Sequence, residues 1–223
     1  IPNAAEDIIV AREVSLSELT GCRVHIAHVS TKGSVDIIRE AKSRGVNVTA
    51  ETAPHYFTLS DESLETFDTH FKVNPPLRSA RDVQSIKNGL KENVIDVIAT
   101  DHAPHSSLEK DVEFDYAASG IVGLETALPL TLRLVKEGAL SMQALIEKCA
   151  VHPAKILGIP KGTLGRGCDA DITIIDPSAV GRVDVSRFKS KSRNSPFNGW
   201  EVEGRARYTI VKGRVVEDGC APG

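Results

Sequence analysis

The sequence has little that points to a secreted, membrane or nucleic-acid-binding protein. Its four cysteines form no C-x-x-C pair, which argues against a zinc ribbon, a redox motif or a disulfide scaffold and favours reduced thiols in a cytoplasmic setting. No apolar run approaches the roughly 18 to 20 residues of a membrane span. Lys and Arg number 27 against 30 Asp and Glu, so no positive surplus favours nucleic acid or a membrane surface. A small molecule or another protein is the remaining class of partner.

The chain also lacks an initiator Met and the charged-then-apolar order of a signal peptide. It starts inside what reads as an amphipathic helix, so we expect that Ile1 is not encoded by the first codon of the gene. What is present is an ordinary globular composition, with 41% hydrophobic and 26% charged residues. That composition supplies a core and excludes collagen-like, coiled-coil and disordered proteins.

Helical and strand patterns alternate along the first part of the chain. Apolar periodicity predicts helices over residues 3–19, 35–43 and 81–92 and strands over residues 23–30, 46–51 and 94–100. The strands end in polar or ionisable residues. This order is typical of parallel βα units, which carry function at the carboxyl ends of their strands. Between them lies a polar segment with a weak helix near residues 61–67, and two prolines forbid a central strand beyond Asn74.

The pattern changes near residue 160. Helices are predicted for residues 124–137, 141–149 and 153–157, whereas Gly-rich turns and short β runs at 171–175 and 208–216 follow. We therefore predict two domains, residues 1–160 and residues 161–223.

Two histidines share the first predicted strand. His25 and His28 are three residues apart, so the alternation of a strand points them to opposite faces and at most one can face the inside of a barrel. His28 lies nearer the carboxyl end and is followed by small Ser30 and Thr31, which makes it the better metal-ligand candidate. The alternative is a core histidine that hydrogen-bonds to the backbone.

Two further turns carry polar candidates. His55 follows the second strand after a proline, where it could bind a metal or hold a loop through a neighbouring carbonyl, and Glu51 could be a structural carboxylate. Asn74 offers both a donor and an acceptor at a stiffened point, which suits recognition of an amide or carboxylate. An Asx turn before proline is the structural alternative for Asn74.

The turn after the third predicted strand is the most informative. Asp101 can bind a metal there and accept a proton from metal-bound water, because the cation lowers the pKa of that water. His105, held by Pro104, is placed to contact a substrate. The preceding apolar strand disfavours the alternative of a helix N-cap Asp with surface histidines. No G-x-S-x-G, P-loop or G-x-G-x-x-G motif is present, and no cysteine has activating neighbours.

Six motifs occur in the order seen in bacterial-type dihydroorotases of the amidohydrolase superfamily, and the chain resembles that family over essentially its whole length. They are AHVST at 27–31, ETAPHY at 51–56, VNPPLR at 73–78, ATDHAPH at 99–105, GIVGLE at 120–125 and NSPFNGW at 194–200. Hydantoinases and allantoinases share the strand-end His and Asp, whereas the NPPLR and DHAPH motifs are similar specifically to dihydroorotase.

The resemblance implies a TIM-type (β/α)₈ barrel with a binuclear zinc centre, and a small flanking β domain to which residues 161–223 contribute. It implies the reversible, zinc-dependent cyclisation of N-carbamoyl-L-aspartate to L-dihydroorotate in pyrimidine biosynthesis. It also implies a homo-oligomer in the cytoplasm, with aspartate carbamoyltransferase as a candidate partner.

The motifs also carry residue roles over from the family. His28 and Asp101 match metal ligands, and Asp101 matches the group that moves the proton. Asn74, His105 and Gly120 match substrate-binding positions. His55 is not a metal ligand in the family, and the resemblance places it behind the ligands.

The chain departs from the family in one large respect. The family's first-strand His-x-His pair and substrate-binding Arg, its bridging carboxylate or carboxylated Lys and its fifth-strand His all precede the segment that matches residue 1. His25 and His28 are one residue too far apart to replace the His-x-His pair. With two candidate ligands the zinc site is incomplete.

We therefore expect the C-terminal part of a dihydroorotase, inactive alone and active with its N-terminal half. The length agrees, since 223 residues fall short of the roughly 250 of a complete barrel. Exposed strand edges should then make the isolated chain prone to association. Two alternatives stay open: a non-catalytic dihydroorotase-like subunit that binds a partner enzyme, and another cyclic amidase such as a hydantoinase or allantoinase.

Overall fold

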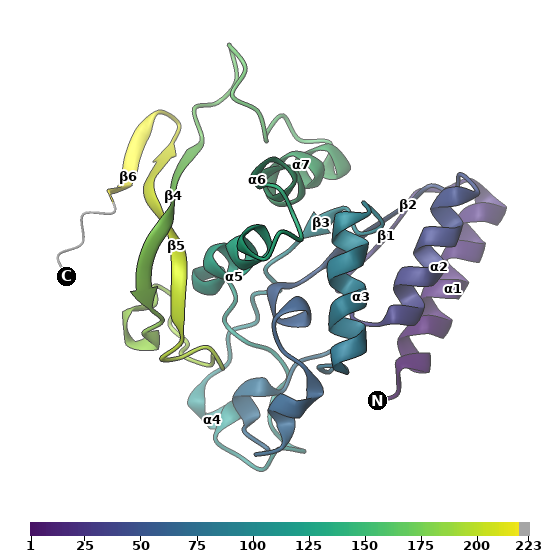
Figure 1. Ribbon diagram of the computed structural model, residues 1–223, viewed down its shortest axis with the longest axis horizontal. Helices are drawn as coiled ribbons and strands as arrows, with labels where there is room; N and C mark the ends of the chain where they lie inside the picture. The colour runs from purple at the N-terminus through teal and green to yellow at the C-terminus, as the bar shows by residue number, and fades with distance from the viewer. Residues whose placement is uncertain (219–223) are drawn as a thin grey trace. The chain divides into compact units, whose positions relative to one another are not determined.

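The computed structural model describes residues 1–218 (Figure 1). The chain divides into two compact units, the first made of residues 1–125 and 185–196 and the second of residues 126–184 and the chain from residue 197 on. The domain boundary near residue 160 stays a prediction. Cys220 lies outside the described residues. Within residues 1–218, no helix is both long and apolar enough to cross a membrane.

The first unit contains the alternating helices and strands that the sequence predicts. Their bounds are α1 Asn3–Thr20, β1 Val24–Ile26, α2 Lys32–Ser43, β2 Val48–Thr52, α3 Ala80–Lys91, β3 Val97–Ile98 and α4 Ser107–Lys110. Short 3₁₀ turns are η1 Pro54–Phe57, η2 Asp61–Leu64, η3 Thr69–Phe71 and η5 Val185–Arg187. The strands form a sheet of order β1-β2-β3 in which both pairs are parallel, so the prediction of parallel βα units is confirmed (Figure 1).

The strands are shorter than the apolar runs that predict them. The hydrogen-bond ladder continues past β3 at both ends, since the amide of Asp96 donates to Ala50 O (2.9 Å) and the amide of Ala99 to Thr52 O (2.9 Å). β1 ends early because His28 takes a left-handed backbone conformation, with φ of 40°, that a strand does not accommodate. The weak helix expected at 61–67 is the single turn η2.

One face of this sheet forms the core of the first unit. Along β2, Val48, Ala50 and Thr52 are buried, whereas the side chains between them are half-exposed. α2 and α3 contribute the buried residues Val35, Ile38, Ala41, Ile86 and Leu90. α2 begins where the Thr31 side chain accepts a hydrogen bond from the amide of Ser34, the usual N-cap geometry.

The other side of the first unit leaves apolar groups uncovered. β1 pairs only with β2, so within residues 1–218 its second edge has no strand partner. α1 buries Val10 and Val14 but exposes apolar residues at several positions, namely Ile8, Ile9, Leu16 and Leu19. Apolar side chains are therefore spread around this helix instead of forming the single apolar face of an amphipathic helix, and the first unit buries only some of them.

The second unit combines helices with an antiparallel sheet. Its elements are α5 Leu124–Lys136, which starts in the last residues of the first unit, α6 Met142–Ile146, the π-helical turn η4 Glu147–Val151, α7 His152–Leu157, β4 Ile172–Arg182, β5 Glu201–Val211 and β6 Arg214–Asp218. The sheet order is β4-β5-β6. The β run predicted at 208–216 is two strands, because Lys212 and Gly213 both take positive φ and turn the chain.

Candidate functional site

The turns after the three parallel strands lie at one edge of the sheet. His28 follows β1, His55 follows β2 and Asp101 follows β3. Nε2 of His55 is 3.7 Å from Oδ2 of Asp101. His28 lies close enough for its charge to act on the pKa of both other groups. The structure therefore places His55 and Asp101 in contact, with His28 near enough to act on both electrostatically, as the positions of the strands predict.

Two of the three residues have an uncommon backbone conformation. φ is 40° at His28 and 46° at Asp101. A left-handed conformation of a residue other than glycine costs on the order of 1–3 kcal/mol and persists where the surroundings hold it. Such outliers are common at functional sites, so they support a functional interpretation of these two turns.

Hydrogen bonds next to these residues hold both turns. After His28, the amide of Val29 donates to Glu51 O (2.8 Å) and the Thr52 hydroxyl donates to Val29 O (2.8 Å). After Asp101, the amide of Ala103 donates to Ile121 O (2.8 Å). The residues that follow the two candidate ligands are therefore held by segments that are distant in the sequence.

His55 is the most enclosed of the three side chains. Its exposed fraction is 1%, and among residues 1–218 its Nε2 atom has no hydrogen-bond partner. Burial, with a smaller contribution from the charge of His28, lowers the pKa of His55 to about 3. The imidazole is therefore neutral near pH 7, so its contact with Asp101 is not a charge pair. A buried nitrogen without a hydrogen-bond partner lowers the stability of the fold by about 1–3 kcal/mol. Such an atom in a native fold therefore calls for an explanation, and a functional role is one.

The carboxyl group of Asp101 has an altered acidity. Burial raises its pKa above the usual value, the charge of His28 opposes that shift, and the charge of Glu51 adds to it. A raised pKa makes the ionised carboxylate a better proton acceptor than an exposed aspartate.

His28 and Asn74 line the same cleft, whose volume is about 450 Å³. The carbonyl of Pro75, next to Asn74, accepts a hydrogen bond from the Tyr56 hydroxyl (2.7 Å), which ties the Asn74 segment to the turn that carries His55. His25 also lines the cleft but contacts different groups: Nδ1 is 2.8 Å from the Thr49 hydroxyl and Nε2 is 3.1 Å from a Glu51 oxygen.

His105 and Gly120 lie side by side. A Cβ on Gly120 would be 3.1 Å from Nε2 of His105 and 2.5 Å from Cβ of Ala103, and φ of Gly120 is 138°, so only glycine fits there. Nε2 of His105 donates to Ser119 O (3.0 Å). The amide of Gly120 donates to Lys72 O (2.9 Å), two residues before Asn74. The three predicted substrate-binding residues are thus joined through short backbone links.

Two buried residues that sequence reasoning did not single out hold this region. The Asn194 amide group accepts from the amide of His105 (3.1 Å) and donates to Gly120 O (3.0 Å) and Ala103 O (3.3 Å). Lys110, 1% exposed, donates to Ala118 O (2.9 Å) and to Gly120 O (3.2 Å). Asn194 opens one of the six motifs, which is a signal for it, whereas no pattern marks Lys110.

The donor set fits zinc in part. An imidazole nitrogen and a carboxylate oxygen are ligands that zinc accepts, and His28 and Asp101 supply one of each beside the unpaired Nε2 of His55. Across residues 1–218, no group of three or more His, Cys, Asp or Glu side chains is arranged to hold a metal ion. These residues therefore fit part of a zinc site and do not complete one.

Parallel strands with helices between them, and with His and Asp after the strand ends, are the pattern of a TIM-barrel-like enzyme, whose functional residues lie at the carboxyl ends of the strands. The amidohydrolase family model matches residues 5–216, and the chain belongs to the amidohydrolase family.

Curated relatives agree with this family. The chain is 60% identical over 216 residues to a dihydroorotase of Geobacter metallireducens, and 54% identical over 216 residues to a dihydroorotase of Syntrophus aciditrophicus. Each match covers 97% of this chain and 51% of the relative. The resemblance to dihydroorotases is therefore confirmed, and the chain spans about half the length of the curated relatives it matches.

Solved structures agree on the fold. An L-hydantoinase (dihydropyrimidinase) from Arthrobacter aurescens superposes with a TM-score of 0.92 at 35% identity, covering 97% of this chain and 49% of that one. A dihydropyrimidinase from Brevibacillus agri has a TM-score of 0.92 at 26% identity with the same two coverages. The fold is TIM-barrel-like, as in other amidohydrolases.

Proposed function

We propose that this chain carries one half of the active site of a zinc-dependent dihydroorotase, which interconverts N-carbamoyl-L-aspartate and L-dihydroorotate in pyrimidine biosynthesis. The observation that carries the proposal is the contact of His55 with Asp101 at the strand ends, with His28 near enough to act on both electrostatically and with left-handed turns at His28 and Asp101. The high identity to curated dihydroorotases over nearly all of this chain supports it.

His28 and Asp101 would hold zinc, together with ligands from the part of the relatives that this chain does not cover. Zinc, when bound, supplies Lewis-acid activation of water and of the amide carbonyl. Asp101 takes up a proton at its carboxylate and returns it to the ring nitrogen as the ring opens, and the raised pKa of Asp101 suits that step. His55, neutral and buried, lies behind Asp101 and excludes water from one side of it.

Asn74, His105 and the backbone at Gly120 would bind the substrate. The amide side chain of Asn74 and the imidazole of His105 complement the carboxylate and the ring carbonyls of dihydroorotate. The amide of Gly120 already donates to Lys72 O, so Gly120 would contribute the space that its missing side chain leaves. Residues 1–160 would belong to a (β/α)₈ barrel, and residues 161–223 would contribute to a small β domain. The complete enzyme would be a cytoplasmic homo-oligomer, with aspartate carbamoyltransferase as a candidate partner.

The test uses the full product of the gene that encodes this chain. We expect it to hydrolyse dihydroorotate and to lose that activity with a chelator, and we expect residues 1–223 alone to be inactive. Preferential turnover of hydantoin or allantoin would replace the proposal with another cyclic amidase, a reading that the hydantoinase-like fold favours. Ring-closing activity in a complex that survives Asp101→Ala would instead favour a non-catalytic subunit.

A further inference from the structure

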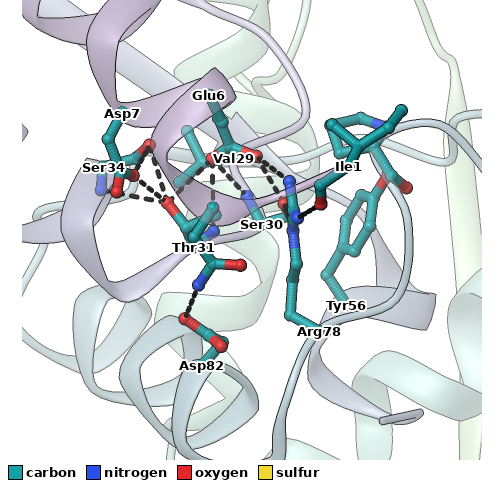
Figure 2. A network of polar contacts seen from close by, with 12 residues as sticks. Ile1, Glu6, Asp7, Val29, Ser30, Thr31, Ser34, Tyr56, Arg78 and Asp82 are labelled. Atoms are coloured by element: carbon teal, nitrogen blue, oxygen red, sulfur yellow. Dashed lines mark hydrogen bonds and ion pairs between the residues drawn. The ribbon is translucent and has the colours of Figure 1, made fainter. Parts of the chain in front are cut away.

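Figure 2 shows that the carboxylate of Glu6, on α1, is bonded to Ser30 and Thr31. These two residues belong to the turn that follows His28. Oε1 of Glu6 accepts hydrogen bonds from the amides of Ser30 (3.0 Å) and Thr31 (3.2 Å) and from the Thr31 hydroxyl (3.2 Å). Oε2 accepts from the Ser30 hydroxyl. The Glu6 side chain, more than twenty residues earlier in the sequence, thus binds the backbone amides of Ser30 and Thr31, which follow Val29.

A buried guanidinium extends this contact to the Asn74 segment. Nε of Arg78 donates to the Ser30 hydroxyl (3.1 Å), and Nη2 lies 3.6 Å from Oε2 of Glu6 (Figure 2). The carbonyl of Arg78 is held in turn by the amide of Asp61 (2.8 Å). Side-chain exposure is only 5% for Arg78 and 12% for Glu6, so the pair is shielded from solvent. Removing one partner of such a pair leaves a buried charge without its counterion.

Glu6 and Arg78 line the same cleft as His28 and Asn74. Arg78 is four residues after Asn74 along a segment stiffened by two prolines, and Glu6 is bonded directly to the turn after His28. The Arg78 guanidinium, paired with Glu6 and bonded to the Ser30 hydroxyl, therefore links the segment of Asn74 to the turn after His28. Its Nη1 atom also donates to Ile1 O (2.7 Å), just before α1. Neither Glu6 nor Arg78 has a place in the reaction proposed above.

Other carboxylates nearby have a different task. Asp82 accepts from the amide of Lys32 (2.8 Å) and from the Asn3 side chain (3.0 Å), and Asp7 accepts from the hydroxyls of Thr31 (2.5 Å) and Ser34 (3.1 Å). These contacts hold the first turn of α2 and its N-cap residue Thr31. Glu6 differs in that it binds the backbone amides of Ser30 and Thr31, which follow the left-handed turn.

We propose that Glu6 and Arg78 are positioning residues, which fix the His28 imidazole relative to the Asn74 side chain across the cleft. The inference rests on the proposed function, because that function assigns metal binding to His28 and substrate binding to Asn74. Loss of Glu6 frees the His28 turn and acts on metal retention and kcat. Loss of the Arg78 guanidinium frees the Asn74 segment and raises KM.

The experiment compares isosteric variants in the full gene product. Glu6→Gln removes the charge but keeps the shape of the side chain. Asp96→Asn is the matched control, since Asp96 also accepts a backbone amide (Ala50, 2.9 Å) and pairs with a lysine (Lys42, 2.7 Å), but at the amino end of β3. Zinc per chain, kcat and KM for dihydroorotate, and hydrogen exchange of peptides spanning residues 26–34 are measured for each.

We expect Glu6→Gln to lower kcat by about 10- to 100-fold, because sub-ångström misplacement of a reacting group has effects of that order. Zinc content should fall and exchange at Ser30 and Thr31 should rise, whereas Asp96→Asn should leave all three near the parent values. Arg78→Lys should raise KM more than it lowers kcat. The Glu6→Gln/Arg78→Lys double variant should lose less than the product of the single effects, because the two residues act through one contact.

Glu6→Gln with parental zinc content, exchange and kcat would overturn the proposal, as would effects equal to those of Asp96→Asn. If Glu6→Gln does not fold, Ser30→Ala removes only the hydroxyl between Glu6 and Arg78 and should shift kcat and exchange in the same direction by a few-fold. If the parent protein does not turn over dihydroorotate, the proposed function fails, while zinc content and hydrogen exchange still decide whether Glu6 holds the His28 turn.

Discussion

The turns at His28 and Asp101 have nearly the same left-handed φ but are held by different means. The first is held mainly by side chains, the Glu6 carboxylate and the Thr52 hydroxyl, beside one backbone bond from the amide of Val29 to Glu51 O. The second is held mainly by backbone, through a parallel bridge between His102 and Ile121 and the bond from the amide of Ala103 to Ile121 O, beside one bond from the amide of Gly123 to Nδ1 of His102. A turn held by side chains can be altered by single polar substitutions. A turn held by backbone is sensitive instead to anything that pushes the two segments apart.

Glycines make the backbone-held turn possible. A Cβ on Gly123 would lie 2.3 Å from Thr100 O, and one on Gly120 would lie 2.5 Å from Cβ of Ala103. The segment that follows Gly120 can therefore lie against the Asp101 turn only without side chains at these two positions.

The largest expected effect separates the chemistry of the Asp101 turn from its shape. Asparagine tolerates a left-handed conformation at least as well as aspartate, so Asp101→Asn should keep the turn and remove only the carboxylate. We expect dihydroorotate turnover by the full gene product to fall on the order of 10³-fold. The midpoint of thermal unfolding should change little. Asp111→Asn, at an exposed position, serves as the control; a loss below about tenfold for Asp101→Asn would contradict the role of the carboxylate.

Substitution of Gly120 tests the backbone-held turn directly. Gly120→Ala places a Cβ against Ala103 at a φ that L residues rarely adopt, so we expect a loss of about 3 kcal/mol in the free energy of unfolding, measured by urea denaturation. Gly45→Ala is the control, because Gly45 has a positive φ of 80° but nothing within 4 Å of the added Cβ. It should cost about 1 kcal/mol. Equal losses for the two variants would show that the close approach at Gly120 contributes nothing.

Lys110 supports the same region and should give it a pH dependence. Burial, with a contribution from the charge of Lys72, lowers the pKa of Lys110 to about 8 in the folded state, against 10.5 for the ordinary value. Between those pH values the unfolded chain binds more protons, so the free energy of unfolding should rise with pH from about 8 to 10.5. We expect a rise of about 2 kcal/mol from this group, because its bonds to carbonyls favour the charged form and oppose part of the shift.

The measurement is the difference between the parent protein and Lys110→Met across that pH range, which cancels the titration of other groups. The free energy of unfolding of Lys110→Met should lack the rise that Lys110 contributes between about pH 8 and 10.5. A constant difference between the two proteins from pH 7 to 11 would contradict the lowered pKa.

The smallest expected effect comes from an exposed ion pair, which serves as a reference for the buried pair of Glu6 and Arg78 at the His28 turn. Arg39 and Glu92 form an ion pair at 2.9 Å, but their side chains are 40% and 51% exposed, unlike the buried pair of Glu6 and Arg78. Glu92→Gln should change the free energy of unfolding by less than about 0.5 kcal/mol, and added salt should remove the change. A loss as large as that of Glu6→Gln in the same denaturation assay would show that burial does not distinguish the two pairs.

Much of the first unit could be predicted from the sequence. Period-2 and helical patterns placed the parallel strands, and polar residues after each strand pointed to His28 and Asp101, because carboxyl ends of parallel strands meet at one edge. The family, the TIM-barrel-like fold and the resemblance to dihydroorotases agree with the comparisons. The roles of His28, Asp101, Asn74, His105 and Gly120 stay predictions.

What the sequence could not show depends on contacts between distant residues. No local pattern marks Glu6, whose partners lie 24 and 25 residues away, or Lys110, whose burial depends on the fold of the Gly120 loop. The left-handed backbone at His28 and Asp101 was not predicted either. Asp and His adopt it more often than most residues but still in a minority of positions, and at these two turns hydrogen bonds to distant segments hold the chain. Strand ends were missed for the same reason.

The long separation of Asn194 from its partners has a consequence for folding. Its side chain bonds to groups 74 to 91 positions earlier, and residues 185–196 rejoin the first unit only after residues 126–184 have entered the second. Such non-local contacts form late, because the chain must close a long loop before they contribute. During synthesis, the loop of His105 and Gly120 therefore cannot form its bonds to Asn194 until the segment of residues 185–196 has been made. A ribosome-bound chain arrested before residue 194 should show that loop as the last part of the first unit to become protease-resistant.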